Sequence, residues 1–214
     1  MKNLLSQSLD AFFLDFDGVV IESADIKTEA FYEIYLPFGQ QIAAKAKNYH
    51  LEFQGVNRTV KFKEIHKIYL GKEISPSEIE NLSIRFSDIV LNKIMACPLV
   101  EGVRDFLEKQ QQDGIPIFLL SATPHHELIL ITEQKGLSAY FKEIYGSPWK
   151  KTQAGEKIIT TYGFSRDKIV FIGDSTSDLE ATIKLKTKFL GRVISRKEHV
   201  FGDHPVIENF YQTL

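Results

Sequence analysis

The chain has 214 residues, of which 43% are hydrophobic and 25% are charged, a balance typical of a globular protein with one large domain or two smaller ones. Its formal net charge of -2 gives no overall basic field that would favour nucleic acid as a partner. A single cysteine, Cys97, excludes a disulfide framework within the chain and a cysteine-based zinc cluster.

The first residues, MKNLLSQSLDAFFLDFDG, do not have the pattern of a secretory signal, because acidic residues follow early and the apolar positions continue into a predicted strand. No apolar run is long enough for a membrane-spanning helix. We therefore expect a cytoplasmic protein, a monomer or weak dimer, with neither nucleic acid nor a membrane as a partner.

The first predicted element is a buried strand, since residues 9–14 are almost all apolar. Asp15, Asp17 and Gly18 follow it in the stretch LDFDGVV. Carboxylates at the end of a buried strand are costly unless a positive charge compensates them. The stretch is therefore either an ordinary Asp-Gly turn or a site that holds a cation and performs chemistry.

Residues 25–95 show helical periodicity and little strand signal. Apolar residues recur at helical spacing in 25–39, 57–71 and 75–95. The third stretch opens with Ser75 as a predicted N-cap and Pro76 at the first helical position. We predict a small helical bundle that is inserted after the first strand.

From Cys97 onward, apolar strands alternate with amphipathic helices. The predicted strands are residues 115–121, 143–146, 168–174 and 187–194, and the predicted helices are residues 100–114, 125–136, 154–163 and 176–186. This alternation predicts an α/β fold, a Rossmann-like parallel sheet core with helices on both faces. The predicted core comprises residues 1–20 and 97–214, and a small all-α domain comprises residues 21–96.

Polar side chains follow four of the predicted strands. They are Asp15 and Asp17, then Ser121, then Ser147 with Lys150 and Lys151, and finally Asp174. Taken singly, each of these polar stretches has an ordinary structural explanation, as a turn, a helix cap or a solvated pair of lysines. Ligands of open parallel sheets bind beyond the carboxyl ends of the strands, so four such ends together favour a functional site.

These stretches resemble the motifs of the haloacid dehalogenase-like (HAD) hydrolase superfamily. LDFDGVV resembles its first motif, Asp-x-Asp-Gly-[Val/Thr], and LLSAT resembles the second, a Ser or Thr that ends a strand. GSPWKK holds the lysine of the third, and IGDSTSD resembles the fourth, Gly-Asp-x-x-x-Asp. The resemblance covers the whole alternating part of the chain. It implies that the insertion, residues 21–96, is the helical cap domain of the family.

The resemblance implies a phosphatase that acts through an aspartyl-phosphate. A carboxylate can attack phosphorus, which divides one difficult step into two, and Asp15 is the candidate nucleophile. Asp17 can reach the leaving oxygen as a general acid and later activate water as a base. Gly18 lets the backbone turn at once, and we assign it to substrate binding together with Ala122.

Crowded carboxylates repel one another unless a hard cation neutralises them, and oxygen-only ligands suit Mg²⁺. Asp15 and Asp174 are the expected side-chain ligands, and the resemblance implies that Asp17 contributes its backbone carbonyl. Asp178, one helical turn after Asp174, would lie near the metal or hold its waters. Ser121 and the backbone after it would donate to the phosphoryl oxygens at a helix start.

The motif lysine would neutralise both the phosphate and Asp15. Two residues compete for this role, because the family often shows Lys-Pro at this point and this chain does not. The layout GSPxxK favours Lys151, which leaves Lys150 as a surface residue.

The expected substrate is a small phosphorylated metabolite, such as a sugar phosphate or a phospho-acid. Arg58, at a helix start in the predicted cap, is the candidate for contacting a second anionic or hydroxyl-bearing group, which suits its planar guanidinium. A phosphosugar mutase of the β-phosphoglucomutase type remains an alternative, since it shares every core motif. The second alternative is a catalytically silent binding protein with the same fold. A dehalogenase would not need Asp17.

Overall fold

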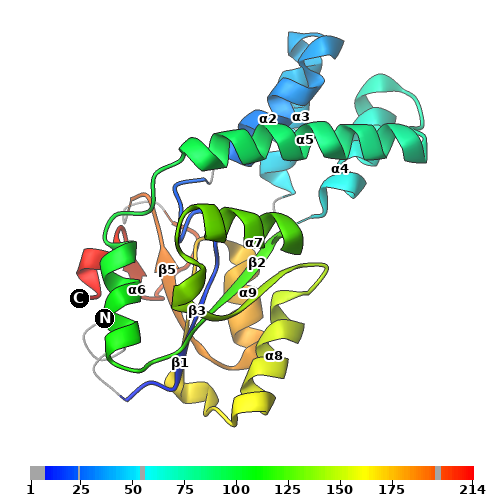
Figure 1. The fold of residues 1–214 in the computed structure, drawn as a ribbon. Coiled ribbons are helices and arrows are strands. Elements are labelled where there is room, and N and C mark those ends of the chain that lie inside the picture. Colours follow the sequence, from blue (N-terminus) through cyan, green and yellow to red (C-terminus); the bar gives the residue numbers. More distant parts are fainter. Residues whose placement is uncertain (1–7, 24, 54–55, 196–198) are drawn as a thin grey trace. The chain divides into compact units, whose positions relative to one another are not determined.

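The computed structural model describes residues 8–23, 25–53, 56–195 and 199–214 of the chain. The chain divides into two compact units (Figure 1). The α/β unit comprises Met1–Glu22 and Pro98–Leu214, and the helical unit comprises Ser23–Cys97.

The α/β unit is built on one parallel sheet of six strands in the order β3-β2-β1-β4-β5-β6. The strands are β1 (Ala11–Leu14), β2 (Ile117–Pro124), β3 (Phe141–Ser147), β4 (Ile169–Gly173), β5 (Lys188–Arg192) and β6 (Val206–Ile207). The predicted parallel α/β core is confirmed. The two-residue strand β6 was not predicted, because two residues show no periodicity.

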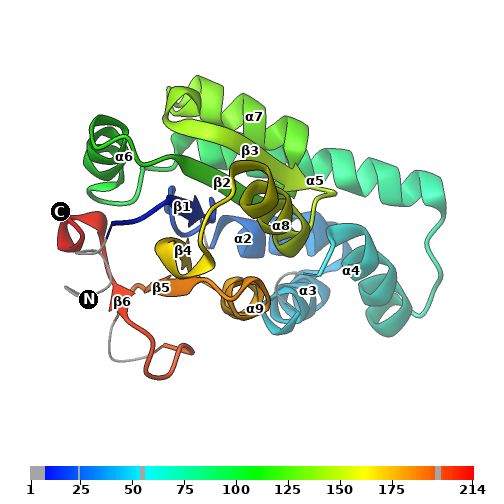
Figure 2. The same cartoon turned by 90° about the horizontal axis from the view of Figure 1, so that it is seen from below.

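Four helices cover the sheet. They are α6 (Val103–Gln112), α7 (His125–Gln134), α8 (Lys151–Tyr162) and α9 (Thr176–Leu185). Figure 2 shows α6 and α7 on one face, with α8 and α9 on the other. The prediction of helices on both faces is therefore confirmed.

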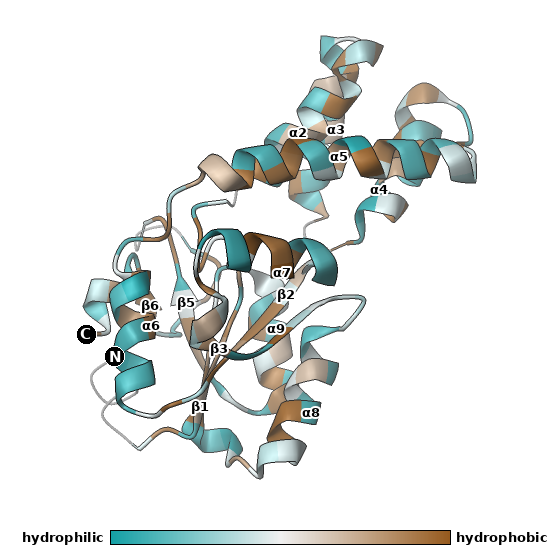
Figure 3. Cartoon of the chain, viewed as in Figure 1, coloured by the Kyte–Doolittle hydropathy of each residue, from teal (hydrophilic) through white to brown (hydrophobic). Residues whose placement is uncertain are grey.

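Strand β1 is completely buried because both faces of the sheet are covered. Phe12 packs edge to face on Phe106 of α6, with ring centroids 5.1 Å apart. Phe13, the next residue, joins the opposite core with Ala154 of α8 and Ala181 of α9. Consecutive side chains thus enter two different cores, which explains the unbroken apolar sequence. In Figure 3, α6 is largely hydrophilic on its outer side.

The strand order contains a topological switch point between β1 and β4. From β1 the chain proceeds to β2 and β3 on one side of the sheet, and β4 begins the other half. Ligands of open α/β sheets bind in the crevice that such a reversal creates at the carboxyl ends of the strands. The topology therefore places the residues that follow β1 and β4 at the expected ligand site.

Within the residues described, the helical unit contains four α-helices. They are α2 (Ile26–Tyr35), α3 (Gln40–Glu52), α4 (Arg58–Ile65), which continues as a π-helical turn (His66–Leu70), and α5 (Pro76–Ala96). The predicted N-cap of α5 is confirmed, because Ser75 forms a capping box with Glu78 and Pro76 is the first helical residue. Helix α3 was not predicted.

The core of the helical unit is aromatic but contains a buried lysine. Phe31 lies within 5.5 Å of Phe62, centroid to centroid, and Nζ of Lys61 lies 5.5 Å above the Phe31 ring. Nζ also lies 2.9 Å from Nδ1 of His50. Burial and the positive charge of Lys27 lower the pKa of Lys61 to about 8. His50, buried and near Lys61 and Lys27, has its pKa lowered to about 3, so it is neutral and accepts this bond.

Candidate active site

Lys151 joins two of the predicted carboxylates. Its Nζ lies 2.9 Å from Oδ1 of Asp15 and 2.5 Å from Oδ1 of Asp178. Lys151 is the first residue of α8, which begins just after β3, so the ammonium group reaches the strand ends. Lys150, one residue earlier, is exposed. Of the two candidate lysines, the structure therefore brings Lys151 into this cluster.

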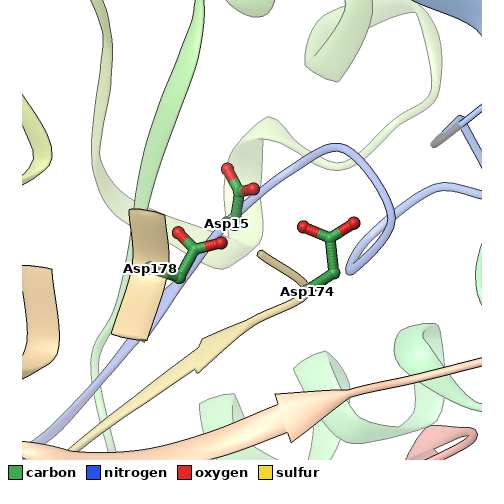
Figure 4. Close-up of side chains that lie close together, drawn as sticks. All are labelled: Asp15, Asp174 and Asp178. Carbon is green, nitrogen blue, oxygen red and sulfur yellow. The ribbon is translucent and has the colours of Figure 1, made fainter. Parts of the chain in front are cut away.

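Three carboxylates gather beside this lysine. Asp15, Asp174 and Asp178 each offer an oxygen, and these oxygens lie within 4.8 Å of one another. Figure 4 shows the three carboxylates pointing to the same side, from the ends of β1 and β4 and the first turn of α9. Oδ1 of Asp15 is buried and makes no hydrogen bond within the described ranges, although Nζ of Lys151 is near. This oxygen-only donor set fits a hard divalent cation.

In this cluster three carboxylates lie beside one ammonium group, so negative charge is in excess. Burial raises the pKa of Asp15 to about 7, and the nearby Asp178 and Asp17 add to this rise while Lys151 opposes it. Burial likewise raises the pKa of Asp174 to about 8, with contributions from Asp15 and Asp178. Burial alone would lower the pKa of Lys151, but the nearby carboxylates of Asp15 and Asp178 have a larger, opposite effect. The pKa of Lys151 is therefore raised, and the ammonium stays protonated. A divalent cation would favour the ionised carboxylates.

The Asp178 carboxylate is held by hydrogen bonds at the N-terminus of α9, the helix to which it belongs. Its Oδ2 accepts hydrogen bonds from the Ser175 backbone N–H at 3.1 Å and from the Ser175 hydroxyl at 2.6 Å. Oδ1 accepts from Lys151. Asp178 is fully buried, and a Cβ on Gly173 would lie 2.2 Å from its Cβ, so the helix approaches the strand end closely. Asp178 therefore orients Lys151, and its own oxygens are largely occupied.

Asp17 lies outside the cluster of three and has a different partner. Its Oδ2 accepts a hydrogen bond of 2.8 Å from the hydroxyl of Thr123, which is buried in β2. Sequence reasoning missed Thr123, although it stands two residues after Ser121 in the second motif. A hydroxyl at this spacing from a motif residue is the signal that could have identified it.

Gly18 is required where the chain turns away from β1. Its φ of +71° favours glycine, and a Cβ at this position would lie 2.0 Å from Oδ2 of Asp174. The glycine therefore permits both the turn and the close approach of the Asp174 carboxylate.

We expected Ser121 at the start of a helix, but the structure places it elsewhere. β2 continues to Pro124 and α7 begins only at His125, so Ser121 lies within the strand. The pairing of β2 with β3 shifts register between Leu120 and Pro124, and this irregularity carries the strand past its predicted end. Ser121 is buried, and its hydroxyl accepts a 3.0 Å hydrogen bond from the backbone N–H of Thr123. Ala122, between them, is exposed.

Arg58 is the first residue of α4, in the helical unit. Asn57 caps this helix, because its Oδ1 accepts a 2.9 Å hydrogen bond from the Thr59 backbone N–H. The Arg58 guanidinium lies 5.5 Å above the Phe86 ring. Its predicted contact with substrate stays a prediction.

Solved structures share this fold at low sequence identity. A predicted phosphoglycolate phosphatase from Haemophilus somnus 129PT aligns with a TM-score of 0.75 at 14% identity, over 97% of each chain. CbbY (mutant D10N) from Rhodobacter sphaeroides, in complex with xylulose-(1,5)-bisphosphate, aligns at 0.73 and 15% identity, over 94% of this chain and 95% of that one. The putative HAD-hydrolase YfnB from Bacillus subtilis, bound to magnesium, aligns at 0.72 and 16% identity, over 97% of each.

Among curated protein sequences, no significant match to the chain was found. No helix in the described part of the chain has the length and apolar character needed to cross a membrane. The family model described as haloacid dehalogenase-like hydrolase matches residues 12–192, a stretch that runs from β1 to the end of β5 and includes all four motifs. The chain belongs to the haloacid dehalogenase-like hydrolase family.

Proposed function

We propose that this hydrolase is a Mg²⁺-dependent phosphatase that acts on a small phosphomonoester through an aspartyl-phosphate intermediate. The observation that carries the proposal is the group of buried and partly buried side chains formed by Asp15, Asp174, Asp178 and Lys151 at the topological switch point. A nucleophile, a cation site and a fixed ammonium are what phosphoryl transfer requires of a protein.

The carboxylates of Asp15 and Asp174, with the backbone carbonyl of Asp17, would hold Mg²⁺. When bound, the ion would neutralise the carboxylates and the phosphoryl oxygens. The magnesium-bound neighbour YfnB supports this choice of metal. Asp178 has both oxygens engaged by Lys151 and Ser175, which favours a supporting role over direct ligation.

Asp15 would attack phosphorus with one carboxylate oxygen. The new O–P bond forms as the bond from phosphorus to the substrate oxygen breaks, and a proton from Asp17 goes to that leaving oxygen. Lys151, which is kept protonated, stabilises the charge on the transferring group. The Thr123 hydroxyl donates to Oδ2 of Asp17 and so helps to hold this carboxyl group in place.

Hydrolysis of the aspartyl-phosphate would complete the reaction. Asp17, now ionised, takes a proton from water, and the water oxygen attacks phosphorus as the bond to Asp15 breaks. Asp15 returns to its carboxylate form and inorganic phosphate leaves. Asp17 would thus serve as acid and then as base while Asp15 is the nucleophile, which accounts for two carboxylates after β1.

We propose that the helical unit is a cap that selects the substrate, a sugar phosphate or phospho-acid, with Arg58 as a contact. Two neighbours support small phosphorylated substrates, one crystallised with xylulose-(1,5)-bisphosphate and one named as a phosphoglycolate phosphatase. The single cysteine is in keeping with a reducing, cytoplasmic setting. A monomer or weak dimer remains our prediction.

The test is phosphate release from a panel of phosphorylated sugars and acids, measured with Mg²⁺ and with excess chelator. We expect release only with Mg²⁺. Full turnover in chelator would contradict the metal assignment. An isomerised sugar phosphate without phosphate release would identify a mutase, and a lack of either product would favour a silent binding protein.

A further inference from the structure

Arg192, the last residue of β5, donates hydrogen bonds to three residues through its guanidinium group. Its Nη1 donates to the carbonyl oxygen of Gly18 at 3.1 Å and to Oε2 of Glu22 at 2.8 Å, and its Nη2 donates to Oε1 of Glu22 at 2.5 Å. Nε donates to the carbonyl oxygen of Glu208 at 3.3 Å. Arg192 is only 7% exposed. A two-pronged arginine–carboxylate pair of this kind fixes direction as well as distance.

Two of the partners of Arg192, Gly18 and Glu22, bracket a tight turn. The Gly18 backbone N–H donates to the carbonyl oxygen of Ile21 at 2.9 Å, and that of Val20 donates to Phe16 at 2.9 Å. Asp17 and Ile21 also form an isolated bridge. The turn therefore has its own hydrogen bonds, and Arg192 adds bonds from β5 to both of its ends, at Gly18 and Glu22.

The turn also adjoins the points where the chain leaves and rejoins the α/β unit. Glu22 is the last residue before the helical unit, and Pro98 is the first residue after it. The Glu22 backbone N–H donates to the carbonyl oxygen of Pro98 at 3.0 Å.

We propose that Arg192 is a positioning residue for the acid–base step of the reaction, holding in place the turn that carries Asp17. This inference rests on the proposed phosphatase function. The Thr123 hydroxyl donates to the Asp17 side chain, and the Asp17 backbone is directly joined to Gly18, whose carbonyl oxygen accepts a hydrogen bond from Arg192. Misplacement of a catalytic group by about 1 Å can lower a rate by roughly a hundredfold. Arg192 acts through Asp17 and needs no contact with substrate.

The chain offers a matched control. Arg166 also forms a two-pronged pair, with Glu156 at 2.9 and 2.8 Å, and it also donates to a backbone carbonyl, that of Leu185, at 2.7 Å. Arg166 lies in a short 3-10 turn before β4 (Arg166–Lys168), and its bonds join Glu156, in the middle of α8, to Leu185, the last residue of α9. Arg166→Met removes the same kind of bonds as Arg192→Met without touching the turn.

The first readout does not depend on activity. Amide hydrogen exchange over residues 16–22 is compared among the wild type, Arg192→Met, Arg192→Lys and Arg166→Met. We expect exchange faster by on the order of tenfold in both Arg192 variants, since bonds to a charged group are lost, and no change in Arg166→Met. The lysine variant retains the positive charge and serves if the methionine variant does not fold. Unchanged exchange in an Arg192 variant that folds would overturn the proposal.

The second readout is a double-mutant cycle with Asp17→Asn. We expect Arg192→Met to lower kcat by on the order of tenfold with little change in KM, and to cause no further loss when Asp17 is already Asn. A loss that is equally large in the Asp17→Asn background would show that Arg192 does not act through Asp17. A wild-type enzyme without phosphatase activity would instead contradict the proposed function, and the exchange measurement would still decide whether Arg192 holds the turn.

Discussion

Gly18 and Asp174 approach so closely that no side chain fits between them. A Cβ on Gly18 would lie 2.0 Å from Oδ2 of Asp174, and the φ of Gly18 is +71°. The turn after β1 and the carboxylate after β4 are thus fitted to each other, although 155 residues separate them in sequence.

Gly18→Ala should therefore damage the site more than a positive φ alone explains. We expect a loss of about 1–3 kcal/mol in the free energy of unfolding and a weaker Mg²⁺ dependence, because Asp174 must move. Gly136→Ala is the matched control, since Gly136 has a φ of +64° with open space around its Cβ position. Chemical denaturation with and without Mg²⁺ measures both effects. Equal losses in the two variants would show that contact with Asp174 is unimportant.

Lys151→Met should abolish most activity, whereas Lys150→Met should not. The first change leaves Asp15 and Asp178 without their cation, and removal of one partner of a buried ion pair costs about 3–5 kcal/mol unless the carboxylates take up protons. We expect kcat/KM to fall by at least about a hundredfold, the usual effect of losing a group that stabilises transition-state charge. A comparable loss in Lys150→Met would make the assignment of the lysine wrong.

The metal-free protein should become less stable as the pH rises from 6.5 to 8. The pKa values of Asp15 and Asp174 are raised to about 7 and about 8, so the folded chain holds protons that the unfolded chain has released. Their stabilising effect is complete below about pH 4 and is lost as the pH passes through the folded values, by up to about 1.4 kcal/mol per pH unit for each carboxyl.

Mg²⁺ should reverse this loss, because it binds the ionised carboxylates, and its stabilising effect should be larger at pH 8 than at pH 6.5. Asp174→Asn, which removes one of the two titrating groups and a ligand, is the control and should show a flatter profile. Thermal unfolding at these two pH values tests the prediction. A stabilisation by Mg²⁺ that is equal in the variant would place the metal elsewhere.

Arg58→Ala should separate substrate recognition from chemistry. Loss of one charged hydrogen bond costs about 1.5–3 kcal/mol, so we expect kcat/KM for the natural substrate to fall roughly ten- to a hundredfold. p-Nitrophenyl phosphate, which lacks a second polar group, should be hardly affected. Lys63→Ala, an exposed change on the same helix, is the control. If both substrates lost activity equally, Arg58 would serve the structure or the phosphate site.

The sequence was most informative at the strand ends. Buried strands such as β1 have apolar residues throughout, so a carboxylate at their end stands out, and parallel topology brings such ends together. Asp15 and Asp174 are brought together in the structure for this reason, and Asp178 joins them from the first turn of α9. The layout GSPxxK favoured Lys151, and the structure places this lysine beside Asp15 and Asp178. Local pattern and topology were enough for this part of the site.

Other features left too weak a pattern. Helix α3 buries only Ala43, Ala46 and His50, and two alanines and a histidine give no clear apolar stripe. The extension of β2 past Ser121 depends on a register shift against β3, which has no sequence signature here. The two-pronged ion pair of Arg192 and Glu22 joins positions that are 170 residues apart in sequence. These positions meet only once the sheet has formed, so no local pattern indicates the pair.

The most direct test of the account is to find the residue that carries the phosphoryl group. The enzyme is mixed with Mg²⁺ and substrate, quenched in acid within the turnover time, and its peptides are analysed by mass spectrometry. We predict a phosphoryl adduct on Asp15 in the wild type, its accumulation in Asp17→Asn, where the base for hydrolysis is missing, and its absence in Asp15→Asn. An adduct on any other residue, or turnover that persists in Asp15→Asn, would contradict the proposed mechanism.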